Sequence, residues 1–174
     1  MAIEPDTKSW AWVLERPCPD CAYDASTVVL RDMGMTIRDI ASQWEVILLH
    51  PGATKRPVEN VWSPSEYGCH VRDVMRMADF RLDLMTTEDD PMFTNWNQDE
   101  TAVDERYDLQ DPLIVRRELA IAGDLLAERF DGITAGQWSR SGLRSDGTRF
   151  TVESFSRYFL HDPIHHLWDV SRTY

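Results

Sequence analysis

The sequence predicts an all-α protein built as a four-helix bundle. Four segments carry apolar residues at helical spacing, capping signals precede three of these segments, and only one short stretch alternates as β-strands do. A long connection between the second and third helices indicates one crossover. We therefore expect a single domain over residues 1–174, with a short β-hairpin before the last helix.

The composition excludes several classes of function. A chain of 174 residues with a net charge of −12 should repel nucleic-acid phosphates and anionic lipids, so we expect neither nucleic acid nor membrane as a partner. No apolar run reaches the length of a membrane-spanning helix, and the N-terminus lacks the pattern of a secretory signal. The predicted location is the cytoplasm, where three cysteines are better interpreted as thiols or metal ligands than as a disulfide framework.

The first half of the chain should contain an irregular lead-in and two helices. Residues 1–25 combine prolines and short polar residues with tryptophans, a pattern typical of irregular structure. Apolar spacing predicts a helix over residues 26–50, which Pro51 and Gly52 end. The sequence Ser-Pro-Ser-Glu at residues 63–66 is a capping box with proline at the first helical position, so a second helix should run to about residue 85.

The second half should contain the crossover, the hairpin and two further helices. Residues 86–110 are acidic and too long for a plain connection, so we expect them to cross the fold or cover a site. Asp111 and Pro112 begin a third helix that reaches about residue 130. Residues 138–150 alternate around a Ser-Asp-Gly turn and predict a hairpin, and residues 151–170 predict the last helix.

Four of the five histidines occur in only two places. His70 lies on the inward face of the second helix, while His161, His165 and His166 lie on the last. At about 100° per residue, His161 and His165 are within about 40° of each other, whereas His166 points about 140° away from His161. Two helices should therefore direct His70, His161 and His165 into the interior, although Pro163 removes one helix hydrogen bond between the last two.

Buried imidazoles need partners for both ring nitrogens, and a shared divalent cation is one way to satisfy them. The alternative is that each is an ordinary core or surface histidine with its own hydrogen bonds. Three carboxylates, Asp73, Asp162 and Asp169, follow these histidines closely and are candidates to orient an imidazole from outside the ligand set. A solvated helix-face carboxylate is the equal alternative for each of them.

The two histidine-bearing segments are residues 62–73 (WSPSEYGCHVRD) and residues 157–166 (RYFLHDPIHH). They resemble the DinB/YfiT-like superfamily of four-helix metal proteins, which includes mycothiol-dependent maleylpyruvate isomerase. Residues 15–21 and the hairpin at residues 142–151 look like an actinobacterial subgroup of it. The resemblance covers most of the chain, and it implies that His70, His161 and His165 are ligands of one divalent ion.

Other candidate residues accompany this set. Cys18 and Cys21 have the C-x-x-C spacing of half a zinc site completed by Cys69 and His70, of a redox pair, or of buried small side chains. The candidate substrate-binding residues are Arg157, Tyr158 and Trp96. For Arg157 the alternative is an ordinary helix ion pair with Glu153, four residues earlier.

Three neutral imidazoles leave the full charge on the ion and keep coordination positions open, as catalytic sites do. With the resemblance, this predicts a metal-dependent transferase or isomerase that uses a low-molecular-weight thiol such as mycothiol on an electrophilic substrate. Zinc suits the ligands best, and nickel, iron and manganese are also compatible. The alternatives are a metal-dependent hydrolase and a non-catalytic, stress-related binding protein; the sequence identifies no catalytic residue. An exposed apolar helix face would allow a homodimer.

Overall fold

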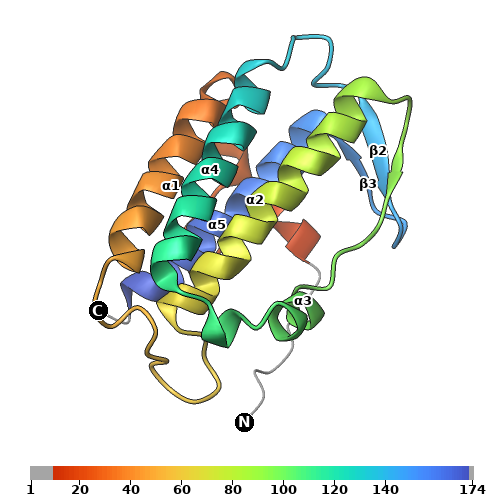
Figure 1. Ribbon diagram of the computed structural model, residues 1–174. Helices are drawn as coiled ribbons and strands as arrows, with labels where there is room; N and C mark the ends of the chain where they lie inside the picture. Colours follow the sequence, from red (N-terminus) through yellow and green to blue (C-terminus); the bar gives the residue numbers. More distant parts are fainter. Residues whose placement is uncertain (1–9, 173–174) are drawn as a thin grey trace.

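A computed structural model describes residues 10–172 and shows a bundle of four long helices (Figure 1). The first nine residues of the expected lead-in, which include the N-terminus where we expected no secretory signal, lie outside the described residues. Within the described part, none of the helices is both long and apolar enough to cross a membrane. The helices of the bundle are α1 (Met33–Leu48), α2 (Pro64–Thr87), α4 (Pro112–Asp131) and α5 (Val152–Ser171).

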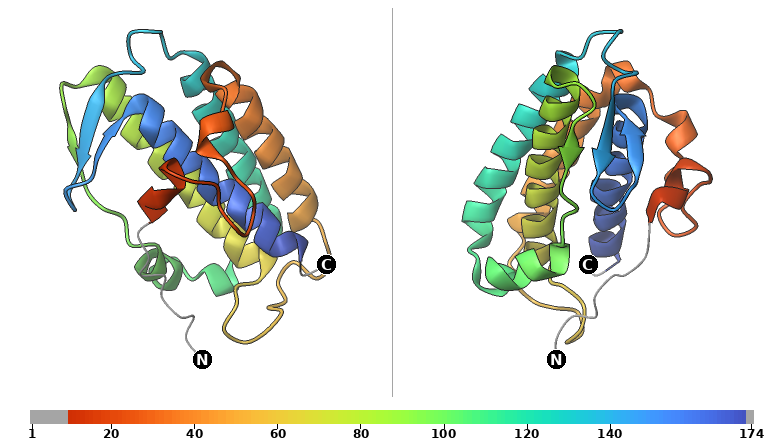
Figure 2. Two further views of the ribbon diagram at one scale, coloured as in Figure 1. Left: turned by 180° about the vertical axis from the view of Figure 1, so that it is seen from behind. Right: turned by 90° about the vertical axis from the view of Figure 1, so that its right-hand side faces the viewer.

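The bundle buries a continuous apolar core. Helix α4 packs against both α1 and α2, and α2 also packs against α5 (Figures 1 and 2). The side chains of Trp44, Leu82, Leu126 and Phe155 are fully buried among the helices. The expected four-helix bundle is therefore confirmed, and the apolar stripes of the sequence are the surfaces that meet in its core.

Local capping explains where α2 and α5 begin. The Ser63 hydroxyl oxygen accepts a hydrogen bond from the Glu66 backbone N–H, and the Glu66 carboxylate accepts one from the Ser63 backbone N–H, so the expected capping box is present. Thr151 and Ser154 form the equivalent arrangement before α5. Glu66 is buried and also forms an ion pair with Arg56. These contacts fix the start of the helix that carries His70.

The Glu66→Gln substitution should lower the free energy of unfolding by about 2 kcal/mol at pH 7, because a charge-assisted hydrogen bond is lost. Burial acts to raise the pKa of Glu66, but hydrogen bonds from Arg56 and Ser63 outweigh it and lower the pKa below 4.5. A lowered pKa stabilises the fold above that value and ceases to do so as the pH falls. Urea unfolding from pH 7 to pH 3 should therefore show the deficit shrinking in acid. An equal loss of unfolding free energy at all pH values would contradict this expectation. The control is Glu128→Gln, at an exposed position of α4.

The first helix begins later than the sequence predicted. In place of a helix from residue 26, the structure has two short 3₁₀ turns, Ala25–Thr27 and Leu30–Asp32, before α1. Extended backbone at Val28 and Val29 separates these turns and interrupts the helix. Val29 is consequently 48% exposed and does not join the buried face that its spacing suggested.

The crossover between α2 and α4 contains ordered structure of its own. It forms strand β1 (Met92–Phe93), helix α3 (Gln98–Asp104) and a 3₁₀ turn, Tyr107–Leu109. Strands β2 (Ser141–Arg144) and β3 (Arg149–Thr151) make the expected hairpin, and β1 adds a parallel third strand to it. The crossover thus runs from the small sheet toward the other end of α2 (Figure 1).

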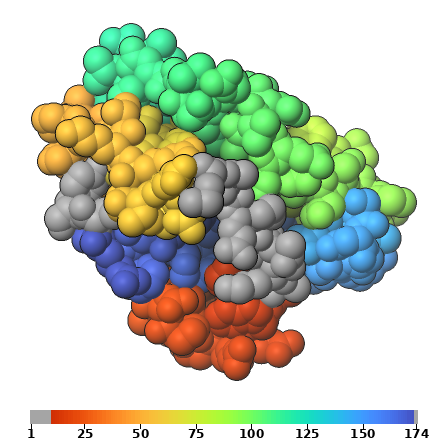
Figure 3. Space-filling view, turned by 90° about the horizontal axis from the view of Figure 1, so that it is seen from below, coloured from red at the N-terminus to blue at the C-terminus, as the bar shows by residue number. Residues whose placement is uncertain are grey.

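The N-terminal segment, residues 10–32, lies along α5 (Figures 2 and 3). Arg157 of α5 fastens it by donating hydrogen bonds to the carbonyl oxygens of Ala25 and Val28, the latter at 3.0 Å. Tyr23 donates from its hydroxyl to the Arg157 carbonyl oxygen. Helix α5 is therefore covered by α2 on one side and by the N-terminal segment on another.

Candidate metal centre

Helix α5 presents two pairs of metal-ligating side chains. His161 and His165 are four residues apart, and so are Asp162 and His166. Because one residue turns a helix by about 100°, the two pairs occupy neighbouring faces. The helix continues through Pro163, so both pairs keep helical spacing.

Asp162 and His166 face His70 of α2, and we call these three residues the histidine–aspartate group. Each offers one ligand atom, and these atoms lie within 4.8 Å of one another. The His70 Nε2 atom is 3.1 Å from Asp162 Oδ1, and the His166 Nε2 atom is 3.7 Å from the same oxygen. The group therefore joins one residue of α2 to two residues of α5.

Neighbouring side chains hold this group in place. The His166 Nδ1 atom is 2.9 Å from Asp169 Oδ2, which leaves Nε2 directed toward Asp162. Trp96 stacks on the His70 ring with 5.5 Å between the centroids. Burial acts to raise the pKa of Asp162, but the charges of His70 and His166 outweigh it and lower the pKa to about 2. Asp162 is thus a carboxylate at neutral pH.

The residues of this group fit a divalent metal ion. Two imidazoles and one carboxylate are ligand types that zinc and its first-row neighbours accept. His70 is completely buried, and its Nε2 atom is the ring nitrogen that faces Asp162. Asp162 and His166 remain 34% and 17% exposed, so the group opens on one side. Three ligands with an open side are the arrangement of a catalytic metal site.

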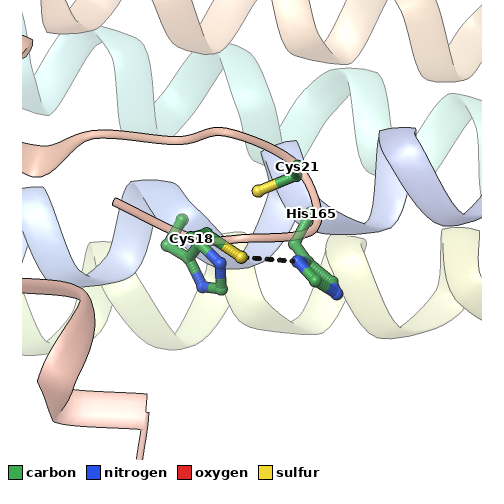
Figure 4. A group of neighbouring side chains, drawn as sticks. Cys18, Cys21 and His165 are labelled. Atoms are coloured by element: carbon green, nitrogen blue, oxygen red, sulfur yellow. Dashed lines mark hydrogen bonds between the residues drawn. The ribbon is translucent and has the colours of Figure 1, made fainter. Parts of the chain in front are cut away.

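His161 and His165 face the N-terminal segment, where they meet Cys18 and Cys21. Figure 4 shows His165 beside the two cysteines. We call these four residues the cysteine–histidine group; their ligand atoms also lie within 4.8 Å of one another. Burial lowers the pKa of His161 to about 4, with a further contribution from His165, and burial also lowers the pKa of His165. Both imidazoles are therefore neutral at pH 7.

The predicted three-histidine set is divided between these two groups. The structure brings His161 and His165 together as expected, but it places His70 with Asp162 and His166 instead. Neighbouring faces of α5 carry the two pairs, so the geometry favours His166 over His161 and His165 as the partner of His70. Asp162 thus lies among the candidate ligands rather than behind them.

The other predicted residues are distributed as follows. Asp169 contacts His166 as an orienting carboxylate should, whereas Asp73 bonds Arg72 and the Tyr107 hydroxyl and contacts no histidine. Arg157 binds the N-terminal segment and forms the alternative ion pair with Glu153. Of the three interpretations of the cysteine pair, a zinc site completed by Cys69 is not what the structure shows, because Cys69 is hydrogen-bonded to Gln110.

A cavity of about 140 Å³ lies beside both groups. Trp96 and Tyr158, which the sequence analysis named as candidate substrate-binding residues, both line this cavity. That they bind substrate stays a prediction. Asp162 and His166 lie on its wall together with Arg81 and Arg144. The two arginines are features that the sequence analysis missed, because nothing in their local sequence marks an inward direction.

The comparisons with known proteins identify the fold. No protein-family model matches the chain, and no curated protein matches it in sequence. Among solved structures, the chain is similar to YfiT from Bacillus subtilis, with a TM-score of 0.70 and 15% identity over 82% of this chain and 86% of that one. YfiT is described as a probable metal-dependent hydrolase with an unusual four-helix bundle topology. The chain therefore has the four-helix bundle fold of YfiT, as its motifs predicted.

Proposed function

We propose that this protein is a metal-dependent hydrolase whose ion is held by the histidine–aspartate group. The observation that carries this proposal is the convergence of His70, Asp162 and His166 beside a cavity that also contains Arg81. The likeness to YfiT supports the proposal through the description of that protein.

The ligand set favours water over other nucleophiles. Two histidines and one carboxylate, with a further position open, are the protein ligands of several zinc hydrolases. When bound, such an ion supplies an activated water and polarises the oxygen of a substrate carbonyl or phosphoryl group. The chain's own residues orient this site: Asp169 fixes the His166 ring, and Trp62 and Trp96 pack around His70 and shield it from solvent.

The cavity favours an anionic substrate. Arg81 is buried, and none of the described carboxylates lies within salt-bridge distance of it; its hydrogen bond goes to the Thr94 carbonyl oxygen at 2.8 Å. Burial, with the nearby Arg144, lowers the pKa of Arg81 to about 10, so the guanidinium is still protonated at pH 7. A buried guanidinium without a carboxylate partner gains stability from an incoming anion. Because Arg81 lies about three turns along α2 from His70, the substrate should be extended, with its anionic end away from the metal.

The Arg81→Met substitution should raise KM for anionic substrates by about 10–100-fold, because a charge-assisted contact is lost, while changing kcat little. The KM for an uncharged analogue should be nearly unchanged. A KM increase that is confined to the anionic substrates distinguishes a role in substrate binding from a general loss of structure. Steady-state kinetics on a matched pair of a carboxylate and its amide would measure the effect. An equal increase in KM for both compounds would contradict the assignment.

The separation of His70 and Arg81 along α2 supports a second candidate function. The distance along α2 between His70 and Arg81 leaves room for a co-substrate, so a low-molecular-weight thiol of the mycothiol type would fit the transferase or isomerase function that the sequence predicted. A thiol that loses its proton at a metal is a strong nucleophile. In this case the arginines would bind the anionic groups of the thiol or of the electrophile.

A turnover assay distinguishes the two chemistries. Apo-protein would be reloaded with zinc, manganese, nickel or iron(II) and supplied with small anionic esters, amides and activated electrophiles, each with and without thiol. Metal-dependent cleavage without thiol is the expected result. Turnover only with thiol would replace hydrolysis by transfer, and ligand binding without any turnover would favour a non-catalytic binding protein.

A further inference from the structure

The cysteine–histidine group lies outside the proposed active site. Its two cysteines come from the N-terminal segment, and its two histidines come from the face of α5 next to the one used by the histidine–aspartate group. Two backbone hydrogen bonds close the loop that carries the thiols: Cys18 N to Tyr23 O at 2.8 Å and Ala22 N to Cys18 O at 3.0 Å. This loop holds both sulfur atoms toward α5 (Figure 4).

The separations in this group match a tetrahedral zinc site. Zinc–sulfur and zinc–nitrogen bonds of about 2.3 and 2.0–2.1 Å place a sulfur and a nitrogen ligand about 3.5 Å apart. The Cys18 Sγ atom is 3.6 Å from His165 Nδ1. All four ligand atoms lie within 4.8 Å of one another, so a small movement toward a common centre would bring them all to bonding distance of one zinc ion.

An unsatisfied polar atom points independently to a ligand here. His161 is only 4% exposed, and its Nε2 atom has no hydrogen-bond partner among the residues that the structure covers. A buried ring nitrogen without a partner costs free energy unless a proton donor or a cation satisfies it. Aromatic rings surround the His161 ring: Trp10, Trp12 and Tyr23 pack around it at centroid separations of 5.2–6.4 Å.

We propose that Cys18, Cys21, His161 and His165 bind a structural zinc ion that fastens the N-terminal segment to α5. Two thiolates and two neutral imidazoles balance the charge of Zn²⁺ and fill four coordination positions, which is the composition of closed, structural sites. Binding releases the two thiol protons to solvent and involves no change of oxidation state. This proposal does not depend on the hydrolase function.

The ion would also shape the active-site cavity. Trp10 lines the cavity and lies against His161 and His165, with centroids 5.2 and 5.4 Å away. Zinc would therefore fix this part of the cavity wall by fixing the segment that carries Trp10. The two metal sites would share α5, with ligands at adjacent positions of the sequence.

The direct test is X-ray absorption at the zinc edge on the purified full-length protein. The expected spectrum contains sulfur scatterers at about 2.3 Å together with nitrogen or oxygen scatterers at about 2.0–2.1 Å. The His166→Ala variant should keep the sulfur signal, because its lost site contains no cysteine. A wild-type spectrum without sulfur scatterers, or a Cys18–Cys21 disulfide in protein purified with reductant, would overturn the proposal.

Substitutions give a second measurement. The double variant Cys18→Ser, Cys21→Ser should lose one zinc equivalent and become sensitive to proteolysis within residues 10–32, whereas Cys69→Ser should retain both the zinc and the resistance. If the double variant fails to fold, cobalt(II) titration of the wild-type protein replaces it. A sulfur-to-cobalt charge-transfer band is then expected, and its absence at saturating cobalt would overturn the proposal.

Discussion

The His166→Ala variant should lose the ion of the histidine–aspartate group and at least about 100-fold in kcat/KM. Removal of an outer hydrogen-bond partner of a metal ligand typically costs 10–100-fold in metal affinity or activity, and removal of a ligand should cost more. His166 combines two roles, because its ring faces Asp162 and is oriented by Asp169. Metal analysis after dialysis and steady-state kinetics would measure both losses.

Two controls make this result specific. His50→Ala removes an exposed histidine beyond the end of α1 and should change neither metal content nor activity. His161→Ala separates the two ligand assignments, because this variant should retain the ion beside His70. Full occupancy and activity in His166→Ala, with loss of that ion in His161→Ala, would restore the three-histidine set that the sequence predicted.

The Arg72→Met variant should be less stable than the wild type by about 3–5 kcal/mol, the usual effect of breaking a buried ion pair from one side. The Arg72 side chain is 4% exposed and forms bonds of 2.7–2.9 Å with Asp73, Gln110 and Glu118. Asp73 in turn accepts a hydrogen bond from the Tyr107 hydroxyl. Without Arg72, the largely buried Asp73 carboxylate loses a charged partner that offsets its burial. The crossover also loses a hydrogen bond that joins Gln110 to α2.

Thermal denaturation would measure this effect as a decrease in Tm of about 10 °C for a protein of this size. Arg76→Met is the matched control, because Arg76 also contacts Asp73 but is 49% exposed. Exposed ion pairs contribute about 0–1 kcal/mol, so its Tm should change by only a few degrees. Equal decreases in the two variants would contradict a special role for the buried arginine.

The helices could be predicted from the sequence wherever local chemistry decides them. The capping boxes at Ser63 and Thr151 and the Asp111–Pro112 start are satisfied within a few residues, so they do not depend on the rest of the fold. The start of α1 was misplaced because apolar spacing alone marked it. The extended backbone at Val28 belongs to the docking of the N-terminal segment on α5, which is a non-local contact.

The sequence indicated which helices carry the candidate ligands, but it could not determine which of these side chains lie together. Both helices and the histidine cluster were identified, yet two overlapping i, i+4 pairs on α5 differ by only one residue. Which pair faces α2 depends on the rotation of α5 about its axis, and packing sets that rotation. The Asp162–His166 spacing was visible in the sequence and would have provided the missing signal.

The partners of the cysteines required the fold. Cys18 and Cys21 lie more than 140 residues from His165 in the chain, so no local pattern connects them. Completion of a zinc site by Cys69 and His70 was one of the three interpretations that the sequence left open. In the structure, Cys69 lies against Gln110, and His70 groups with Asp162 and His166 rather than with Cys18 and Cys21.

Anomalous diffraction at the absorption edge of the bound metal tests the central claim most directly. Crystals of metal-loaded protein should show a peak bounded by His70, Asp162 and His166, on the side that opens to the cavity containing Arg81. A peak enclosed by His70, His161 and His165, or no peak near His70 at saturating metal, would contradict the account.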